Sequence, residues 1–370
     1  MAQFAEDQPH MARALALAQR GLYTTDPNPR VGCVIVKHGA IVGEGWHVRA
    51  GEAHAEIHAL RAAGDNARGA TAYVTLEPCC HYARTPPCTR ALINAGVARV
   101  VSAMQDPNPQ VAGKGAAALM QANIEVKTGL MQTEAEALNP GFISRMRRGR
   151  PYVRAKIAAS LDGRTATARG ESKWITGAAA RADVHAWRAR SSAVVTGIGT
   201  VLADDPALTV RVIPTERQPL RVVVDSRLRL PKAAKLLAAP GALVVAADPN
   251  PDATLTLRQA GAEIICLPQA GGQVDLPALM QYLAAREVNE VLLEAGPTLC
   301  GAMLLAGLID QLVLYFAPCL LGDRARGMFH IPGLERLADR VGLKITEVQA
   351  VGADWRIIAE VAALSPDAAA

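Results

Sequence analysis

The sequence predicts an α/β protein made of two successive domains, and three observations support this fold class. The chain has 370 residues, enough for two separate cores at about 100 to 200 residues each. Strand-like apolar runs alternate with helix-like segments in both halves, which is typical of layered α/β domains. An arginine-rich stretch ends at Pro151. We place the boundary there, with domains over residues 1–150 and 151–370, the first of them a three-layer domain.

In the first half, each element follows from a local pattern. Alanine and leucine at helical spacing predict a helix over 7–20, with Asp7 as N-cap and Gly21 as its end. Glycines at 43 and 45 do not form a phosphate-binding fingerprint, because a third glycine and a strand-to-helix context are missing. The other predicted elements are strands 33–36, 71–76, 98–103 and 123–127, a second strand after the turn at 38–40, and helices 54–63, 88–94, 112–122 and 133–148.

The second half alternates in the same way. A strand over 152–158 and a helix over 178–190 lead to a strand over 193–196 and then a loop over 197–206. Further strands are predicted at 220–225, 242–247, 262–267 and 289–293, with helices between them, and two closing strands at 310–316 and 355–361.

Composition restricts the class of protein. Half of the residues are hydrophobic, a fifth are charged, and the net charge is only +5, which is ordinary for a globular protein and suits anionic small substrates as well as nucleic acid. The arginines between 145 and 150 favour a solvated helix end over an RNA-binding patch. No basic-then-apolar signal or membrane-length apolar run is present. We therefore expect no membrane and no nucleic-acid partner.

Cysteine usage indicates a reducing compartment. The chain has 7 cysteines, an odd number for disulfide pairing, and three of them belong to a candidate metal site. The others lie in apolar runs and are expected to be buried thiols in a cytoplasmic protein. These four are Cys33, Cys266, Cys300 and Cys319.

The residues from 54 to 88 contain the strongest chemical signal. His54, Cys79 and Cys88 offer one imidazole and two thiolates, a ligand set that suits zinc and leaves a fourth tetrahedral position for water. Glu56 is a poor match to zinc beside thiolates and is predicted to carry protons between that water and a substrate. His-x-Glu followed by Pro-Cys and a later Cys is the signature of zinc nucleobase deaminases. Eight residues separate the cysteines here, where the short form has two.

Two other interpretations of this cluster remain open. Cys80 or His81 would complete a closed, structural zinc site, and a zinc-stabilised scaffold protein would show the same ligands without catalysis. Asn28 is expected either to form a turn or to contact a ring amide. His47 is expected to be either a loop residue or a substrate contact.

The first half resembles the deaminase half of the bifunctional riboflavin-biosynthesis proteins. The resemblance rests on Asp26-Pro27-Asn28-Pro29-x-Val31-Gly32, His54-Ala55-Glu56, and the run from Leu76 to Cys88. The sequence departs from the family at Cys80, where serine is usual, and at Ala83, where glycine is usual. The resemblance implies a cytidine-deaminase-like fold and substrate contacts by Asn28, His47, His81, Arg84 and Thr85.

The second half resembles the reductase half of the same family. The matching motifs are Lys156-x-Ala158-x-Ser160-Leu161-Asp162-Gly163, Glu171-Ser172-x-Trp174-Ile175-Thr176, Asp204-Asp205-Pro206-x-Leu208-Thr209-x-Arg211 and Glu294-Ala295-Gly296-Pro297. The resemblance implies a dihydrofolate-reductase-like domain that uses NADPH. It places Ala158, Trp174, Thr200, Asp204, Ser226, Gly296, Pro297 and Thr298 at the cofactor, and Lys156, Ser172, Arg188, Leu208, Arg211 and Glu294 at the substrate. Arg188 and Arg211 are candidates to hold a phosphate through forked donors.

The resemblance implies a two-step function. Zinc-dependent hydrolytic deamination of 2,5-diamino-6-(5-phosphoribosylamino)pyrimidin-4-one would be followed by NADPH reduction of the ribosyl group, giving 5-amino-6-(5-phosphoribitylamino)uracil. The family also implies a homo-oligomer, either a dimer or a tetramer. The main alternative is a tRNA or mononucleotide deaminase with an unrelated appended domain, which would have no use for NADPH.

Overall fold

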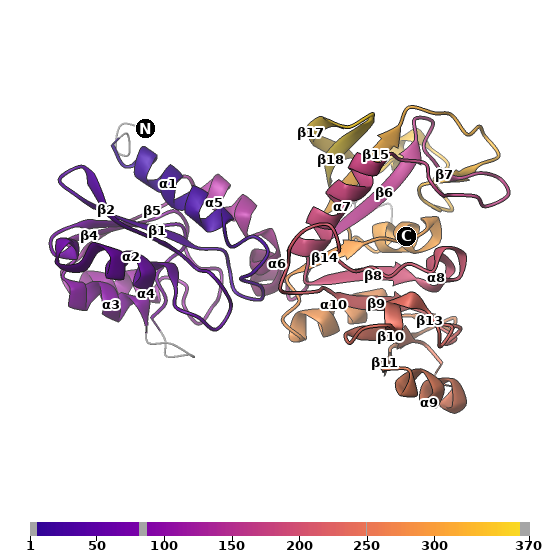
Figure 1. The fold of residues 1–370 in the computed structure, drawn as a ribbon, viewed down its shortest axis with the longest axis horizontal. Helices are drawn as coiled ribbons and strands as arrows, with labels where there is room; N and C mark the ends of the chain where they lie inside the picture. Colours follow the sequence, from indigo (N-terminus) through magenta and orange to yellow (C-terminus); the bar gives the residue numbers. More distant parts are fainter. Residues whose placement is uncertain (1–5, 81–86, 249, 363–370) are drawn as a thin grey trace. The chain divides into compact units, whose positions relative to one another are not determined.

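The computed structural model describes residues 6–80, 87–248 and 250–362 of the chain. The chain divides into two compact units, residues 1–149 and 150–370 (Figure 1). Among the described residues, none of the helices combines the length and the apolar character needed to cross a bilayer.

The first unit is a three-layer domain around a five-stranded sheet in the order β2-β1-β3-β4-β5. The β1 strand is antiparallel to both of its neighbours, whereas β3, β4 and β5 are parallel. Helices α1 and α5 pack on one face of the sheet, and α2, α3 and α4 pack on the other. The bounds are α1 Gln8–Gln19, β1 Gly32–Lys37, β2 Ala40–Trp46, α2 Ala55–Ala63, β3 Thr71–Val74, α3 Cys88–Ala95, β4 Arg99–Ser102, α4 Lys114–Gln121, β5 Glu125–Thr128, α5 Gln132–Leu138 and α6 Pro140–Arg148.

Two predictions for this unit were wrong. The segment predicted as one helix over 133–148 is two helices, because Pro140 lacks the N–H that would continue α5. Asp7 precedes α1 but makes no side-chain cap. Its carboxylate instead accepts hydrogen bonds from the Tyr73 hydroxyl and the Arg99 guanidinium, at 2.7 Å each. Asp7 therefore ties the start of α1 to the central strands β3 and β4.

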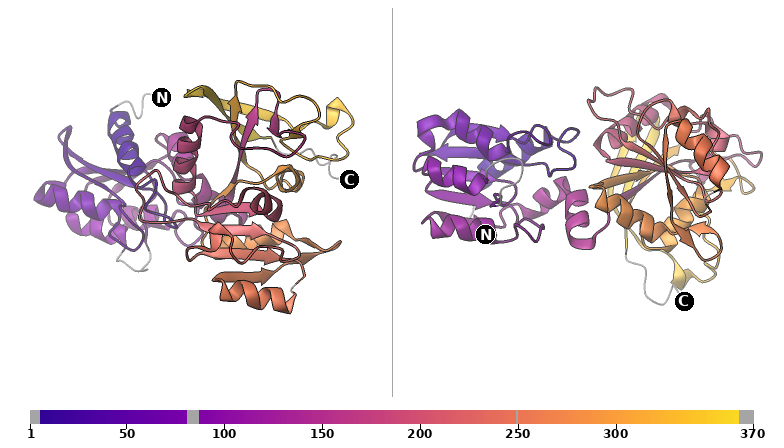
Figure 2. Two further views of the ribbon diagram at one scale, coloured as in Figure 1. Left: turned by 45° about the vertical axis from the view of Figure 1, so that its right-hand side comes forward. Right: turned by 90° about the horizontal axis from the view of Figure 1, so that it is seen from below.

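The second unit contains a nine-stranded sheet in the order β11-β10-β9-β8-β14-β6-β15-β18-β17. The strands from β11 to β15 in this order are parallel, and β18 and β17 are antiparallel additions at one edge. Helices α10 and α11 cover one face, and α7, α8 and α9 cover the other (Figure 2). The bounds are β6 Tyr152–Ser160, β7 Arg164–Ala166, α7 Ala178–Arg190, β8 Ala193–Gly197, α8 Ile198–Asp204, β9 Leu220–Val224, β10 Ala242–Ala246, α9 Pro251–Gln259, β11 Ala262–Cys266, β12 Pro268–Gln269, β13 Gln273–Val274, α10 Leu276–Ala285, β14 Glu290–Leu293, α11 Pro297–Leu305, β15 Gln311–Ala317, β16 Arg326–Gly327, β17 Leu343–Val351 and β18 Asp354–Val361.

Several predictions for this unit need correction. Residues 198–204, predicted as a loop, form α8. Between β9 and β10 the described chain forms only a short 3₁₀ turn at Lys235–Leu237. The edge strand β17 was not predicted, because its residues are almost all exposed and its pattern lacks a buried face. Cys33 and Cys300 are buried as expected, but Cys266 and Cys319 are exposed.

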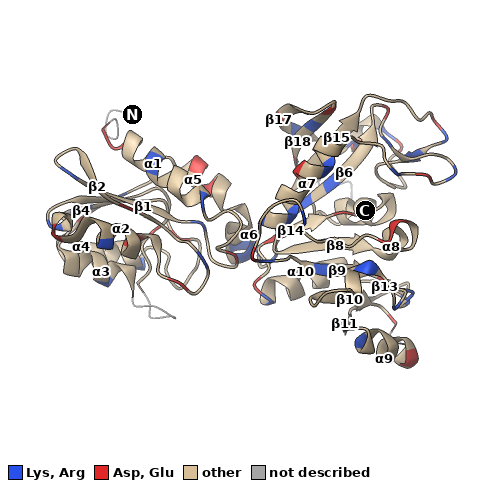
Figure 3. Cartoon of the chain, viewed as in Figure 1, with Lys and Arg blue, Asp and Glu red and all other residues tan. Residues whose placement is uncertain are grey.

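Both basic and acidic residues occur on the helices of each unit, whereas α10 and α11 carry no charged residue (Figure 3). At the end of α6, Arg147 lies 3.7 Å from Glu136, and Arg148 donates to the Ser144 hydroxyl. These contacts within the unit are consistent with a charged helix end of the kind that the sequence favoured.

Candidate active sites

Three elements of the first unit, α2, α3 and the segment after β3, converge on the predicted metal ligands. His54 is the residue before α2, Glu56 lies in the first turn of that helix, and Cys88 is the first residue of α3. Cys79 follows the end of β3. Since α2 and α3 cover the same face of the sheet, these separate segments bring one nitrogen and two sulfurs together.

The geometry of this cluster fits a tetrahedral metal ion. The Nδ1 atom of His54 lies 3.2 Å from the Sγ atom of Cys88 and 3.6 Å from that of Cys79. All three donor atoms lie within 4.8 Å of one another. Zinc bonds to nitrogen and sulfur imply nitrogen–sulfur separations of about 3.5 Å. Among the described residues, no fourth His, Cys, Asp or Glu joins the group.

The charges in the cluster favour metal binding and proton transfer. A hydrogen bond from Cys88, followed by the interaction with His54, lowers the pKa of Cys79 to about 4, which favours the thiolate, the form that binds metals. The same hydrogen bond and burial raise the pKa of Cys88. Burial, and next the charge of Cys79, raise the pKa of Glu56 to about 7. A carboxylate of this kind exchanges protons readily near neutral pH.

Two glycines explain how α2 comes so close to the sheet. A Cβ atom on Gly43 would lie 2.2 Å from the carbonyl oxygen of Ala59, and one on Gly45 would lie 2.4 Å from that of Ala55. The paired glycines of β2 are therefore a packing feature for the helix that follows His54 and carries Glu56. Sequence reasoning excluded a phosphate loop here but missed this purpose.

Asn28 and His47 lie beside the metal cluster. The ring of His47 stacks edge-on against that of His54, with centroids 5.3 Å apart. Its Nδ1 lies 3.2 Å from the carbonyl oxygen of Ala53, and its Nε2 lies 3.0 Å from the Asn28 amide nitrogen. Burial lowers the pKa of His47, and the two contacts fit one ring nitrogen as donor and the other as acceptor, the pattern of a neutral ring. The nitrogen facing the carbonyl carries the proton, and Nε2 accepts from the Asn28 amide.

Three predicted substrate contacts, His81, Arg84 and Thr85, lie outside the described residues. Cys80 is partly exposed and does not belong to the metal group. Burial raises the pKa of Cys80.

In the second unit, the predicted cofactor residues gather at one edge of the sheet. Parallel strands have their carboxyl ends on the same edge, where α/β proteins bind ligands. Thr200 follows β8, Ser226 follows β9, and Gly296 follows β14, and these three strands are neighbours. The Thr200 hydroxyl accepts a hydrogen bond from the Gly296 amide at 3.1 Å. Pro297 and Thr298 then begin α11, whose N-terminus suits a pyrophosphate.

A buried carboxylate lies at the same edge, directly after β14. Glu294 accepts two hydrogen bonds from Arg188, at 2.6 and 3.0 Å, and its carboxylate lies 3.4 Å from the Lys156 ammonium. Burial alone would raise the pKa of Glu294, but the charges of Arg188 and Lys156 outweigh burial and lower it to about 2. Arg188 was expected to hold a phosphate with its forked donors, but this fork is occupied by Glu294.

The remaining predicted residues differ in how they are placed. The Ser172 hydroxyl donates to Asp204 at 3.3 Å, and Lys173, which sequence reasoning missed, donates to the Asp204 carbonyl at 2.9 Å. The Trp174 side chain is 70% exposed, with the Arg181 guanidinium stacked 4.6 Å from its ring. Ala158 packs against the hydrophobic residues of α7 and β15. Leu208 is buried against Val194 and Leu292. Arg211 is exposed, and its guanidinium donates one hydrogen bond to the Thr209 hydroxyl.

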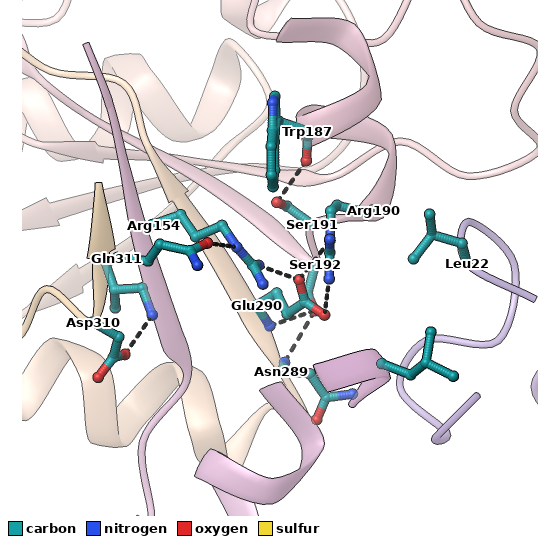
Figure 4. A network of polar contacts seen from close by, with 12 residues as sticks. Leu22, Arg154, Trp187, Arg190, Ser191, Ser192, Asn289, Glu290, Asp310 and Gln311 are labelled. Atoms are coloured by element: carbon teal, nitrogen blue, oxygen red, sulfur yellow. Dashed lines mark hydrogen bonds and ion pairs between the residues drawn. The ribbon is translucent and has the colours of Figure 1, made fainter. Parts of the chain in front are cut away.

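A second buried carboxylate lies at the opposite end of β14. Glu290, the first residue of the strand, is held by Arg154 and Arg190 (Figure 4). Arg154 also donates to Gln311 at 2.8 Å, and the Ser192 hydroxyl accepts from the Glu290 amide. This network joins the amino ends of β6, β8 and β14, far along the strand from the edge that carries Glu294, and we interpret it as structural.

Fold and site together define a zinc-dependent pyrimidine deaminase followed by a dihydrofolate-reductase-like reductase. Residues 5–104 match the cytidine and deoxycytidylate deaminase zinc-binding region, and residues 151–357 match the RibD C-terminal domain. The chain is 54% identical over 366 residues to the riboflavin biosynthesis protein RibD of Escherichia coli K12, covering 94% of this chain and 98% of that protein.

Solved structures agree with these matches. The RibD structure of Acinetobacter baumannii, form 2, superposes with a TM-score of 0.90 at 47% identity, covering 97% of this chain and 100% of that one. A deaminase/reductase from Thermotoga maritima gives a TM-score of 0.85 at 32% identity, covering 96% and 99%. The chain belongs to the RibD family of bifunctional riboflavin-biosynthesis proteins.

The chain is therefore a bifunctional enzyme that deaminates and then reduces a pyrimidine intermediate of riboflavin biosynthesis, with a zinc-binding deaminase domain and an NADPH-dependent reductase domain. The predicted α/β fold, with a cytidine-deaminase-like domain before a dihydrofolate-reductase-like domain, is confirmed. The comparisons support this interpretation and not the alternative of a tRNA or mononucleotide deaminase.

Proposed function

We propose that residues 1–150 carry out the deamination, with His54, Cys79 and Cys88 as the zinc ligands and Glu56 as the catalytic acid and base. The observation that carries this proposal is the burial of Glu56 beside a three-donor cluster. Bound zinc would supply Lewis acidity and an acidic water. Glu56 would take up one proton from the water and deliver it to the ring nitrogen, and would then pass the second proton, from the added hydroxyl, to the amine, which leaves as ammonia while the carbon becomes a carbonyl.

Asn28 and His47 are proposed to orient the pyrimidine. Because the Asn28 amide nitrogen donates to His47, the amide oxygen of Asn28 is left to accept a hydrogen bond from the ring or its amino group. His81, Arg84 and Thr85 are proposed, from the family motif alone, to contact the polar and anionic part of the substrate.

Residues 151–370 are proposed to carry out the reduction. NADPH supplies a hydride for C1′ of the ribose. Ala158, Trp174, Thr200, Asp204, Ser226 and the turn Gly296, Pro297 and Thr298 would line the cofactor. The protein's own task is to place the nicotinamide against that carbon and to exclude water.

Around the ribosyl phosphate, the contacts suggest a division of roles. Lys156 and Glu294 would contact the ribosyl group, and Arg188 would hold Glu294 ionised through its two hydrogen bonds. Arg211 is exposed and its guanidinium donates to the Thr209 hydroxyl among the described contacts, so its forked donors suit the phosphate. Ser172 and the backbone of Leu208 would complete the substrate site.

We also propose that the protein is a homo-oligomer, either a dimer or a tetramer, in the cytoplasm. The edge strand β17 exposes Leu343, Ile345 and Val348, and an exposed apolar strand at a sheet edge favours pairing with a second copy. The cysteines of the described structure are all free thiols, which suits a reducing compartment.

The test is incubation of the whole enzyme with the diaminopyrimidinone ribosyl phosphate, with and without NADPH. We expect ammonia release in both samples and loss of NADPH absorbance only after deamination has begun. Ammonia release without any cofactor oxidation would contradict the reductase proposal. No ammonia from the zinc-loaded enzyme would contradict the deaminase proposal.

A further inference from the structure

The residue before Pro78 and Cys79 has an environment that the activity alone does not explain. Glu77 is buried, with 5% of its surface exposed, and neither cation nor hydroxyl is among its described partners. Its carboxylate accepts three backbone N–H groups, from Asp106 at 3.2 Å, Gly113 at 3.0 Å and Ala116 at 3.0 Å. A buried carboxylate that is fully satisfied by amides is held rigidly.

These three donors belong to the loop after β4 and to the first turn of α4. The carboxylate, which lies in the segment after β3, therefore caps α4 at the helix end where negative charge is favourable. The Glu77 amide in turn donates to the Met104 carbonyl at 3.0 Å. Main chain and side chain of Glu77 thus both fasten the end of β3 to the segment that follows β4.

Pro78 and Cys79, the next two residues, connect the fixed Glu77 backbone to the Cys79 sulfur. A Cβ atom on Gly115 would lie 2.1 Å from the Pro78 carbonyl oxygen, so the Pro78 backbone rests directly on α4. Cys79 then accepts the Cys88 amide at its sulfur, at 3.4 Å, and the Thr89 amide at its carbonyl, at 3.2 Å. The Cys79 sulfur is therefore held between α4 on one side and the start of α3 on the other.

We infer that Glu77 is a positioning residue for the zinc ligand Cys79, acting through its three hydrogen bonds to the start of α4 and the preceding loop. The inference rests on the proposed zinc site. Glutamine at position 77 has the same shape, but its NH₂ group would face one of the backbone N–H donors and the negative charge would be lost. The segment that carries Cys79 would then be free to move away from His54 and Cys88.

The experiment compares Glu77→Gln with Asp7→Asn in the full-length enzyme. Asp7 lies in the same domain and is also buried, and its carboxylate accepts hydrogen bonds from Tyr73 and Arg99. Because Asp7 lies at the start of α1, it is a control for the loss of a buried carboxylate away from the metal ligands. Zinc affinity is measured by competition with a chromogenic chelator, and the cobalt-substituted protein gives a visible spectrum of the sulfur-ligated metal. Thermal unfolding and reductase activity are measured on the same samples.

We expect Glu77→Gln to weaken zinc binding by about 10- to 100-fold, the range found when a group that orients a metal ligand is removed, and to alter the cobalt spectrum. We expect Asp7→Asn to lower the unfolding temperature without either change, and both variants to retain reductase activity. Zinc affinity of Glu77→Gln within twofold of wild type, or equal losses in both variants, would overturn the inference.

Two further variants keep the test decisive. Should Glu77→Gln fail to fold, Glu77→Asp keeps the charge but is too short to reach all three amides. If Glu77→Asp binds zinc more weakly than Asp7→Asn does, the inference is supported. If the two variants bind zinc equally well, the inference is overturned. Cys79→Ala separates the two proposals. If Cys79→Ala binds zinc as tightly as wild type, the proposed metal site itself is wrong. If Cys79→Ala loses zinc but Glu77→Gln keeps wild-type zinc affinity, only the positioning role of Glu77 is refuted.

Discussion

Replacing Glu294 by glutamine should destabilise the second domain strongly, because its buried carboxylate lies between two partly buried cations, Arg188 and Lys156. Its side chain is 8% exposed, and the net effect of its surroundings lowers its pKa from 4.5 to about 2. At about 1.4 kcal/mol per tenfold change in proton affinity, this corresponds to about 3 kcal/mol of stability near neutral pH. Removing one partner of a buried ion pair costs about 3 to 5 kcal/mol by mutation, so the two arguments agree.

The effect should depend on pH with a definite sign. Because the folded state lowers the pKa of Glu294, its contribution is fully present above pH 4.5 and is lost as the pH falls from 4.5 toward 2. The difference in unfolding free energy between wild type and Glu294→Gln should therefore be about 3 kcal/mol at pH 7 and should shrink by more than half near pH 3.

Urea unfolding followed by tryptophan fluorescence is a suitable assay, because Trp174, Trp187 and Trp355, three of the 4 tryptophans, lie in the second domain. The matched control is Glu263→Gln, whose ion pair with Arg286 is exposed and should contribute less than about 1 kcal/mol. A difference below about 1 kcal/mol for Glu294→Gln at pH 7, or one that acid leaves unchanged, would refute the buried-pair argument.

Four other predictions concern the two sites. Glu56→Gln should lower the deamination rate by about 10²- to 10⁴-fold while zinc content and reductase activity stay at wild-type levels; a near-normal rate of ammonia release would contradict its role. Removing zinc with a chelator should abolish deamination and leave NADPH oxidation on the deaminated substrate intact, as measured on the same sample. Gly45→Ala should destabilise the first domain by about 1 to 3 kcal/mol in thermal unfolding, because its methyl group would lie 2.4 Å from the Ala55 carbonyl; an unchanged midpoint would show that α2 adjusts at no cost. Arg211→Ala should raise the KM for the phosphorylated reductase substrate at least tenfold with little change in kcat, whereas a lowered kcat at constant KM would argue against phosphate binding.

The elements of the fold that could be predicted are those with a buried face and a local end signal. Gly64 ends α2 and Pro140 begins α6, and both are readable from the sequence, although Pro140 was overlooked as the break in a longer helix. The β17 strand has almost no buried residue, so its hydrophobic pattern does not reveal it. The α8 helix has two glycines at or next to its start, which favour a loop by propensity, and packing of Ile198 and Val201 overrides that preference.

The two sites differ in how far sequence alone could define them. His54 and Glu56 lie within one helical turn, and Cys79 and Cys88 flank one loop, so ligand chemistry and spacing indicate a metal site without any fold. The proposed reductase site combines Lys156 from β6, Arg188 from α7 and Glu294 after β14, and no local pattern links them.

Only the sheet order, which makes β14 the neighbour of β6 and β8, brings these three side chains together. The same topology explains why β14 carries a buried carboxylate at each end with different consequences. Glu290 lies where the strand begins, among Arg154 and Arg190, whereas Glu294 lies at the carboxyl edge, where parallel strands open onto ligands. Position along a strand, rather than residue type or burial, therefore separates Glu290, interpreted as structural, from Glu294, proposed as functional, and that position exists only once the sheet has formed.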